Sequence, residues 1–348
     1  MFWSRRREGS HRRSGGRRGP LIAAIVKFAA ISVGIYFAIA LGLIASQRPL
    51  KLAGEGGLDF SPLTGGETGE PAALQPYTAR DGSQLYFRSY ASGRDDAPLL
   101  VFIHGSGWHS LGYDGLARSI AASGAADVVL PDLRGHGPNP RRRGDIDYIG
   151  QFEDDLADLI GIVRKPGQTL MIGGHSSGGG LAIRFCGGAY GEMAEGAVLL
   201  APYLHYKAPT VRPNSGGWAH PLTRRIIGLT MLDTIRITAL NFLPAIQFAF
   251  PQSVLDGPQG GTATKAYSFR LNTSYAPRND YKADIAAVPR FLLVAGSDDE
   301  AFVASEYEPV MSAANPKGSY EIIEGLSHLE VIDAPQAASA ISSFIEKL

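Results

Sequence analysis

The run TLMIGGHSSGGG at residues 169–180 constrains the fold of this chain more than any other part of its sequence. Residues 170–172 are apolar, as in a buried strand, and the segment LAIRF after the glycines has helical character. Between them lies the pattern Gly-x-Ser-x-Gly, centred on Ser176. A strand that turns this sharply into a helix strains the residue at the bend, so its neighbours must be small. Such a turn would project the Ser176 hydroxyl beside the N–H groups of a helix start, where a nucleophile would lie.

The Gly-x-Ser-x-Gly pattern can also arise without a catalytic serine. A chain with 43 glycines can contain it by chance, and glycine-rich turns between a strand and a helix also bind phosphates. The chain has neither a GxGxxG spacing with an acidic residue after a second strand nor a G-K-[ST] sequence. A serine nucleophile is therefore the favoured interpretation, and its partners must be sought elsewhere in the chain.

The composition suits a globular protein with a sizeable core, because 45% of the 348 residues are hydrophobic and 19% are charged. This length accommodates one large α/β domain with an insertion. The single cysteine, Cys186, cannot form an internal disulfide and is expected to lie in the core. The sequence contains no HExxH motif and no Cys/His cluster, so we expect neither a metal nor another cofactor.

The first 46 residues combine a basic tail with an apolar segment. Residues 1–20 contain seven arginines and one acid, whereas residues 21–46 are apolar and carry no charge from position 28 onward. Such a run is long enough to cross a membrane as a single helix. The positive-inside rule then places the N-terminus in the cytoplasm and the main domain on the other side, which is the periplasm in a bacterium.

The same residues also fit two alternatives to a membrane anchor. A cleaved signal peptide would need a small residue at position −3, where this chain has Leu43 or Ile44. The arginine cluster could instead be a tail that binds nucleic acid. Nothing in the rest of the chain resembles a nucleic-acid reader, so we expect a membrane contact and no nucleic-acid partner.

Residues 47–76 are rich in Gly, Pro, Thr and Glu, which predicts a flexible linker with Leu58 or Phe60 packed on the following domain. The domain spans residues 77–348, where an Asp81-Gly82 turn precedes a regular alternation of elements. Strands are predicted at 84–91, 98–105, 127–133, 196–204, 289–296 and 319–325 besides the one before Ser176, and helices at 113–124, 148–163, 300–313 and 333–347 besides the one after it.

Continuous apolar strands that alternate with helices predict a mostly parallel sheet with helices on both faces. Residues 205–285 break this alternation and contain many aromatic side chains. We predict that they form an inserted helical cap. Three polar residues, Asp233, Arg236 and Asn241, interrupt their apolar run and argue against a second membrane helix.

The last two predicted strands end in groups that could activate Ser176. The first is followed by Asp298 and Asp299, and the second by His328. A serine hydroxyl is a poor nucleophile until a base removes its proton, and that base needs a partner that orients it. Because the carboxyl ends of parallel strands meet at one edge of a sheet, we expect these groups to lie near Ser176. The chain order Ser, Asp, His is also the one used on this kind of scaffold.

Six motifs occur in a familiar order: HGSG (104–107), DLRGHG (132–137), GGHSSGG (173–179), LLAPYL (199–204), GSDDEAF (296–302) and GLSH (325–328). With them, the chain from about residue 77 onward resembles the α/β-hydrolases. More narrowly, it is similar to the branch of monoglyceride lipases, lysophospholipases and serine aminopeptidases. The resemblance implies an α/β-hydrolase fold with a mostly parallel central sheet, helices on both faces and an inserted helical cap, here behind a single N-terminal transmembrane helix. It implies little about the substrate, because this scaffold carries many chemistries.

The resemblance also implies roles for individual residues. Ser176 would be the nucleophile, His328 the base and Asp299 the acid that holds the imidazole. The family pattern has the acid three residues after the glycine, which favours Asp299, although Asp298 stays possible. In some relatives the acid follows the strand after the nucleophile, but LLAPYLHY contains none.

The same resemblance suggests which groups would contact the substrate. The backbone N–H groups of Ser106 and Ser177 would form the oxyanion hole. Gly107 is the alternative second donor, and Trp108 is expected to wall the substrate pocket.

An apolar cap on a membrane-tethered enzyme suggests lipid-like esters, such as monoacylglycerols or lysophospholipids, as substrates. The cap side chains Phe242, Leu243, Ile246, Phe248 and Phe250 could line an acyl channel, or they could simply pack the cap onto the core.

Three further functions are compatible with the sequence. A serine aminopeptidase would need an acidic group in the cap to hold the substrate amine, for which Asp233, Asp256 and Asp280 are candidates. An acyltransferase would share the acyl-enzyme intermediate. A membrane-anchored binding protein without catalysis is the alternative from another class.

Overall fold

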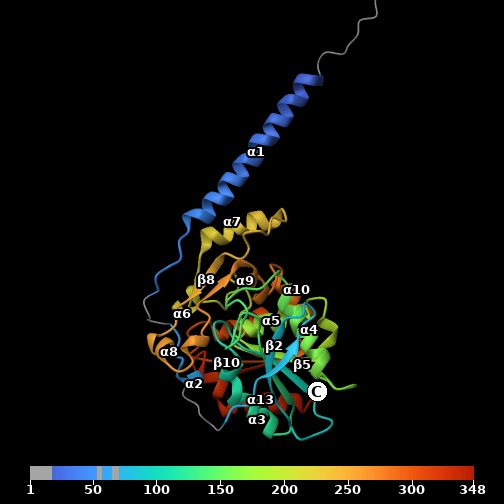
Figure 1. Cartoon of the computed structure of the whole chain (residues 1–348). Coiled ribbons are helices and arrows are strands. Elements are labelled where there is room, and N and C mark those ends of the chain that lie inside the picture. The colour runs from blue at the N-terminus through green and yellow to red at the C-terminus, as the bar shows by residue number, and fades with distance from the viewer. Residues whose placement is uncertain (1–17, 53–56, 65–69) are drawn as a thin grey trace, which may run out of the picture.

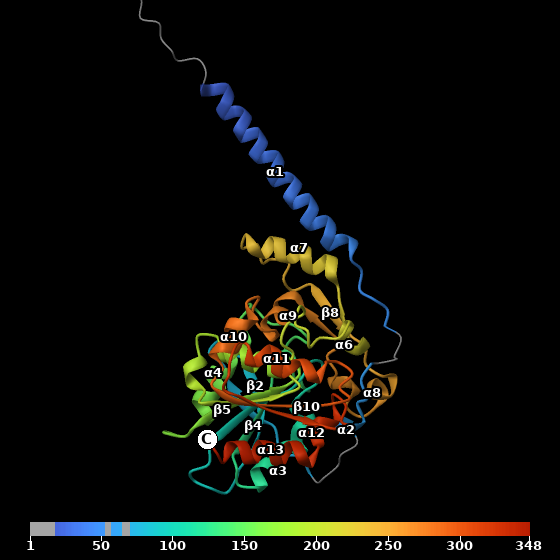
Figure 2. The same cartoon turned by 180° about the vertical axis from the view of Figure 1, so that it is seen from behind.

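The computed structural model describes residues 18–52, 57–64 and 70–348 (Figure 1). Most of the predicted basic tail, residues 1–17, and parts of the predicted linker lie outside the described residues. Within the described chain one long helix stands away from a body built around a large sheet, as Figures 1 and 2 show from opposite sides.

The long helix is α1, Arg18–Ser46, which contains the predicted membrane segment. Its stretch Pro20–Ser46 has a mean hydropathy of 2.3 and is mostly exposed. A helix of this length and composition can cross a membrane, and a signal sequence has the same properties. Its apolar side chains are exposed along almost the whole helix, which is unfavourable in water and typical of a membrane segment or a signal sequence.

The central sheet has eight strands in the order β1-β2-β4-β3-β5-β6-β10-β11. Their bounds are β1 Gln75–Thr78, β2 Gln84–Tyr90, β3 Leu99–Ile103, β4 Asp127–Asp132, β5 Leu170–His175, β6 Gly196–Leu200, β10 Arg290–Gly296 and β11 Gly318–Ile323. Only the pairs β1–β2 and β2–β4 are antiparallel, and all others are parallel. The mostly parallel sheet is therefore confirmed, and every residue of β3, β5 and β6 is buried, as their continuous apolar sequences predicted.

Helices cover both faces of this sheet. On one side α3, Asp114–Ala122, packs on α13, Pro335–Ile345, and the other side carries α4, Gln151–Val163, and α5, Ser177–Cys186 (Figures 1 and 2). The predicted helix at 300–313 is shorter than expected, because α11 begins only at Tyr307 and ends at Ser312. A further short helix, α12, spans Glu330–Asp333.

The insertion between β6 and β10, called the cap here, is not purely helical as expected. Its helices are α6 Asn214–Gly217, α7 Thr223–Thr234, α8 Gln252–Asp256, α9 Phe269–Tyr275 and α10 Tyr281–Ala287, and its strands β7 Ala219–Pro221, β8 Pro244–Phe248 and β9 Ala266–Ser268 form an antiparallel sheet. The apolar segment that suggested helical structure is divided between α7 and β8. Helix α7 ends at Thr234, and just beyond it the Ile237 N–H donates to the carbonyl of Leu232. Short apolar runs are compatible with either a helix or a strand, so periodicity alone could not place β8.

The cap contacts the apolar helix through α7. Ala40 and Ile44 of α1 are buried against Leu229 and Leu232 of α7. A Cβ atom at Gly228 would collide with the Ala40 carbonyl oxygen, so glycine allows the two helices to approach closely. The C-terminal half of α1 and the cap thus form one packed unit, with the cap next to any membrane that α1 crosses.

Candidate active site

Ser176 lies at the predicted sharp turn between β5 and α5. Its backbone has φ 55° and ψ −121°, a strained combination for a residue with a side chain. Its N–H donates to the Leu200 carbonyl at 2.9 Å, which ties the bend to β6. A Cβ atom at Gly174 would collide with Gly178, and one at Gly178 would collide with the Ile103 carbonyl oxygen. The glycines of the motif are therefore required by space, as the sequence analysis expected.

Asp299 and His328 form a buried pair on the loops after β10 and β11. The Asp299 Oδ2 atom lies 2.8 Å from His328 Nδ1, and both side chains are almost fully buried. The other carboxylate oxygen, Oδ1, accepts the N–H groups of Ala301 at 2.8 Å and Phe302 at 2.7 Å. These two bonds hold the carboxylate in place and leave Oδ2 for the histidine ring. A ring nitrogen beside a carboxylate carries the proton, so Nε2 is free to act as a base.

The structure also distinguishes the two neighbouring aspartates. Asp298 is exposed, and its carboxylate accepts the Ser297 hydroxyl at 3.0 Å. Asp299, in contrast, makes the contact with His328. The family pattern favoured Asp299 and kept Asp298 possible, and the loop geometry puts Asp299 beside His328.

Ser176 and His328 line the same small pocket, together with Ser106 and Trp108. The Ser176 hydroxyl makes no hydrogen bond to the His328 ring in the part of the chain that the structure describes. Catalytic hydrogen bonds of this type are often long before a substrate is bound. The arrangement places a strained serine and an oriented imidazole on one pocket, with the acid behind the imidazole.

Two backbone N–H groups near Ser176 are available to an oxyanion. Within the described chain, Gly105 donates its N–H to the Tyr113 hydroxyl at 2.8 Å and Gly107 donates to the Tyr267 hydroxyl at 2.5 Å. The N–H of Ser106 has no such acceptor there, and that of Ser177 is the first of α5 and has no partner within the helix. Gly107, the alternative donor considered from the sequence, is thus already engaged.

The neighbouring histidines support the fold. Burial lowers the pKa of His104, His136 and His175, so these rings are neutral near pH 7. His104 Nε2 accepts the Leu133 N–H at 3.2 Å, which holds the loop after β4. His175 lies between the Tyr113 hydroxyl and the His328 carbonyl, both at 3.0 Å, and so positions the backbone of His328.

Sequence reasoning was only partly right about the pocket walls. Trp108, which the resemblance suggested as a wall, lines the pocket, and Trp218 of the cap and Leu58, Phe60 and Leu63 of the linker line it too. The suggested acyl-channel residue Phe242 is half exposed, and Leu243 packs against the α1–α7 cluster instead. Two features of the sequence could have pointed to the missed pocket residues: Trp218 is a tryptophan in the cap, and Leu58, Phe60 and Leu63 are isolated apolar residues in a polar linker.

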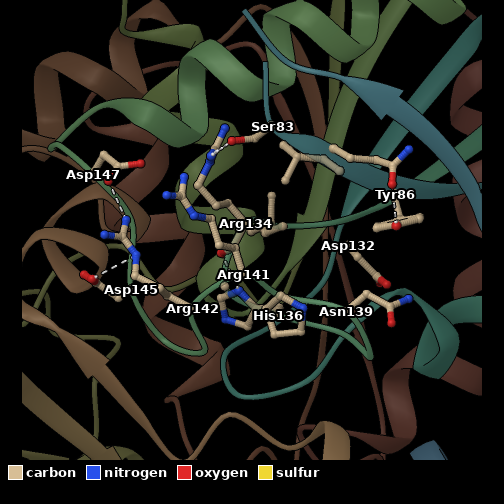
Figure 3. A pocket seen from close by; sticks show the side chains of 15 residues that line it. Ser83, Tyr86, Asp132, Arg134, His136, Asn139, Arg141, Arg142, Asp145 and Asp147 are labelled. Carbon is tan, nitrogen blue, oxygen red and sulfur yellow. Dashed lines mark hydrogen bonds and ion pairs between the residues drawn. The ribbon is translucent and has the colours of Figure 1, made fainter. Parts of the chain in front are cut away.

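A second hollow lies beside the loop after β4 (Figure 3). It shares no lining residue with the pocket at Ser176. Two of its carboxylates pair with one guanidinium, since Arg142 contacts Asp145 at 3.5 Å and Asp147 at 2.5 Å. The described residues also contain no group of three or more His, Cys, Asp or Glu side chains arranged to hold a metal ion. The groups suited to nucleophilic chemistry therefore gather at the pocket of Ser176.

An eight-stranded, mostly parallel sheet with helices on both faces, a serine at its strand–helix turn and a cap after β6 defines the α/β-hydrolase class. Within that class, the family described as serine aminopeptidase, S33, matches residues 95–334. This match covers more than half of the chain, which belongs to this family.

Named relatives agree with this assignment. A monoacylglycerol lipase of Mycolicibacterium smegmatis is 28% identical over 36% of this chain and 44% of its own length. The human monoglyceride lipase is 28% identical over 43% of this chain and 48% of its own length. The chain thus spans less than half of these relatives. The solved structure of a soluble variant of monoglyceride lipase from Saccharomyces cerevisiae shares the fold, with a TM-score of 0.59 and 16% identity over 80% of this chain and 96% of that one.

Proposed function

We propose that this protein is a membrane-anchored serine hydrolase that cleaves carboxylic esters with lipid-like acyl groups. The observation that carries the proposal is the buried Asp299–His328 pair, whose imidazole lines the same pocket as the strained Ser176. A serine, an imidazole and a carboxylate in this relation constitute the machinery for acyl transfer through a covalent intermediate.

Each residue then has a defined role in the reaction. His328 Nε2 takes the proton of the Ser176 hydroxyl as its oxygen attacks the ester carbonyl, and Asp299 stabilises the imidazolium through Nδ1. The negative oxygen of the tetrahedral intermediate accepts hydrogen bonds from the N–H groups of Ser106 and Ser177. His328 gives its proton to the leaving alcohol, which yields the acyl-enzyme, and then activates the water that hydrolyses it.

The pocket favours an ester with an apolar acyl group over a peptide with a free amine. The described residues that line it contain no carboxylate, and most are apolar or aromatic. The acidic residues considered for an aminopeptidase have other contacts. Asp233 accepts from Asn241 at 2.7 Å, Asp256 from Gln252 at 2.9 Å, and Asp280 caps α10. The names of the mycobacterial and human relatives support the same substrate class.

A series of acyl esters tests this function. For the purified full chain, kcat/KM on p-nitrophenyl esters is expected to rise from acetate to decanoate, by about fourfold for each methylene that becomes buried. Aminoacyl p-nitroanilides serve as the peptidase comparison, and Ser176→Ala gives the background rate. Equal or better turnover of acetate or of the anilides would contradict a lipid-like substrate.

We further infer that α1 is an uncleaved anchor, with the N-terminus in the cytoplasm and the hydrolase domain on the other side. The arginines before the apolar segment and the packing of α1 on α7 support this orientation and retention of the helix. A C-terminal fusion to a reporter that is active only in the periplasm is expected to be active in a bacterial host. An active cytoplasmic reporter at the same position would contradict the orientation.

A further inference from the structure

Residues 57–64, called the strap here, follow the apolar helix and lie over the pocket of Ser176. The strap contains the short helix α2, Ser61–Thr64, and its side chains Leu58, Phe60 and Leu63 are buried. It passes close to the cap, because a Cβ atom at Gly57 would collide with the Gly216 carbonyl oxygen. On its other side α2 packs on residues 110–113 and on α12. The strap therefore covers the junction between the cap and the core.

Phe60 fills the apolar part of this pocket. Its ring centroid lies 5.6 Å from that of Trp108, 5.2 Å from that of Trp218 and 5.1 Å from that of Phe250. With the strap in place, the space left beside Ser176 and His328 holds about one water molecule. An acyl chain longer than a few atoms cannot enter while Phe60 stays there.

Where the structure describes it, the strap contacts the body of the protein through apolar side chains. Among the described residues, its hydrogen bonds are internal: Asp59 Oδ1 accepts from the N–H and hydroxyl of Ser61, and the Phe60 carbonyl accepts from the Leu63 N–H and the Thr64 hydroxyl. Removing it from the pocket breaks no hydrogen bond to the body of the protein, so its release is opposed mainly by exposure of its apolar side chains.

Hydrogen bonds do hold the chain on either side of the strap. Before it, Leu50 is bonded through both its N–H and its carbonyl to the Gln247 side chain of the cap. After it, Ala72 donates its N–H to Asp114 and accepts from Arg88. Residues 57–64, which have no hydrogen bond to the body among the described residues, therefore lie between two anchored points, and the strap can leave the pocket and return to it.

We propose that the strap is a lid whose Phe60 occupies the acyl-binding site formed by Trp108, Trp218 and Phe250, and that it leaves this site when an acyl chain enters. This inference rests on the proposed ester hydrolysis. In water the closed form is favoured, because opening exposes Leu58, Phe60 and Leu63. An acyl chain that replaces Phe60 restores the buried apolar contacts with Trp108, Trp218 and Phe250. Opening is thereby coupled to lipid-like substrates.

The first test weakens the strap. Phe60→Ala is expected to raise kcat/KM for p-nitrophenyl decanoate by about tenfold, with a change of less than about twofold for the acetate. Phe344→Ala is the matched control, because Phe344 of α13 is similarly buried but does not line the pocket. This control is expected to lower thermal stability while the decanoate-to-acetate ratio stays constant. An unchanged or lower ratio in Phe60→Ala would overturn the proposal.

The second test observes the strap directly and does not depend on catalysis. A bimane label is placed on Ser61→Cys, which directly follows Phe60, whose ring packs on Trp108 and Trp218. We expect these two tryptophans to quench the label while the strap is closed. Cys186 does not compete for the label, because burial raises the pKa of its thiol to about 12. In a Ser176→Ala background, p-nitrophenyl decanoate is expected to increase the fluorescence and the acetate to leave it constant. No response to the decanoate rejects the lid.

Labelling of Ser176 separates this proposal from the function on which it rests. A small fluorophosphonate that fails to label Ser176 in both the wild type and Phe60→Ala would refute the serine-hydrolase function. Labelling with a constant ester ratio and constant bimane fluorescence would refute the lid alone.

Discussion

Replacing Ser176 with alanine is expected to lower kcat by about a millionfold and to abolish labelling by a fluorophosphonate. The change removes the attacking oxygen, while the Asp299–His328 pair and the N–H groups near the pocket remain in place. Alanine supplies no other nucleophile, so only substrate binding and the oxyanion donors could still accelerate ester hydrolysis. Ester hydrolysis and probe labelling of the purified full chain measure the effect.

The neighbouring serine provides the matched control for this variant. Ser177 would act through its backbone N–H, which Ser177→Ala retains, so this variant is expected to keep its labelling and most of its activity. Ser176→Ala also leaves the backbone strain unchanged, because alanine keeps the Cβ atom that makes this positive φ unfavourable. If Ser176→Ala were still labelled at the wild-type rate, the nucleophile would be another residue and the proposed mechanism would be wrong.

Asp299→Asn is expected to lower kcat by about ten thousandfold, with a much smaller change in KM. The amide oxygen would accept the N–H groups of Ala301 and Phe302, since these donors already bind Oδ1. The amide NH₂ group would then face His328 Nδ1 and force that nitrogen to act as an acceptor. The ring proton moves to Nε2, and the base loses the lone pair that it needs for Ser176.

Asp298→Asn is the control for this prediction. Its carboxylate is exposed and contacts Ser297 rather than the imidazole, so its activity is expected to stay near that of the wild type. Steady-state kinetics on one good ester substrate measure both variants. A large loss in Asp298→Asn, with Asp299→Asn unaffected, would show that the loop rearranges in solution and that the other aspartate supports His328.

Local sequence patterns predicted most of the central domain, because its helices have apolar residues at three- and four-residue spacing and its inner strands are continuous apolar runs. The continuous apolar strands at β3, β5 and β6 must be buried on both faces, and this requires a mostly parallel sheet. The glycines around Ser176 could also be interpreted in advance, since they permit a bend that larger residues would block. The cap was harder, because its short apolar runs fit a helix or a strand equally well, and β8 forms only where β7 and β9 pair with it.

The sequence by itself determined the class of fold, the apolar helix and a short set of candidate site residues, because these depend on local periodicity, spacing and residue chemistry. Only the tertiary structure decided that Asp299 rather than Asp298 contacts His328, that Gly107 is engaged by Tyr267, and that Phe60 lies in the pocket. Phe60 and Trp218 are 158 positions apart in the printed sequence, and their contact depends on how the linker and the cap pack on the sheet. Contacts of this kind have no local signature, because the free energy that forms them comes from burying surfaces that distant segments contribute.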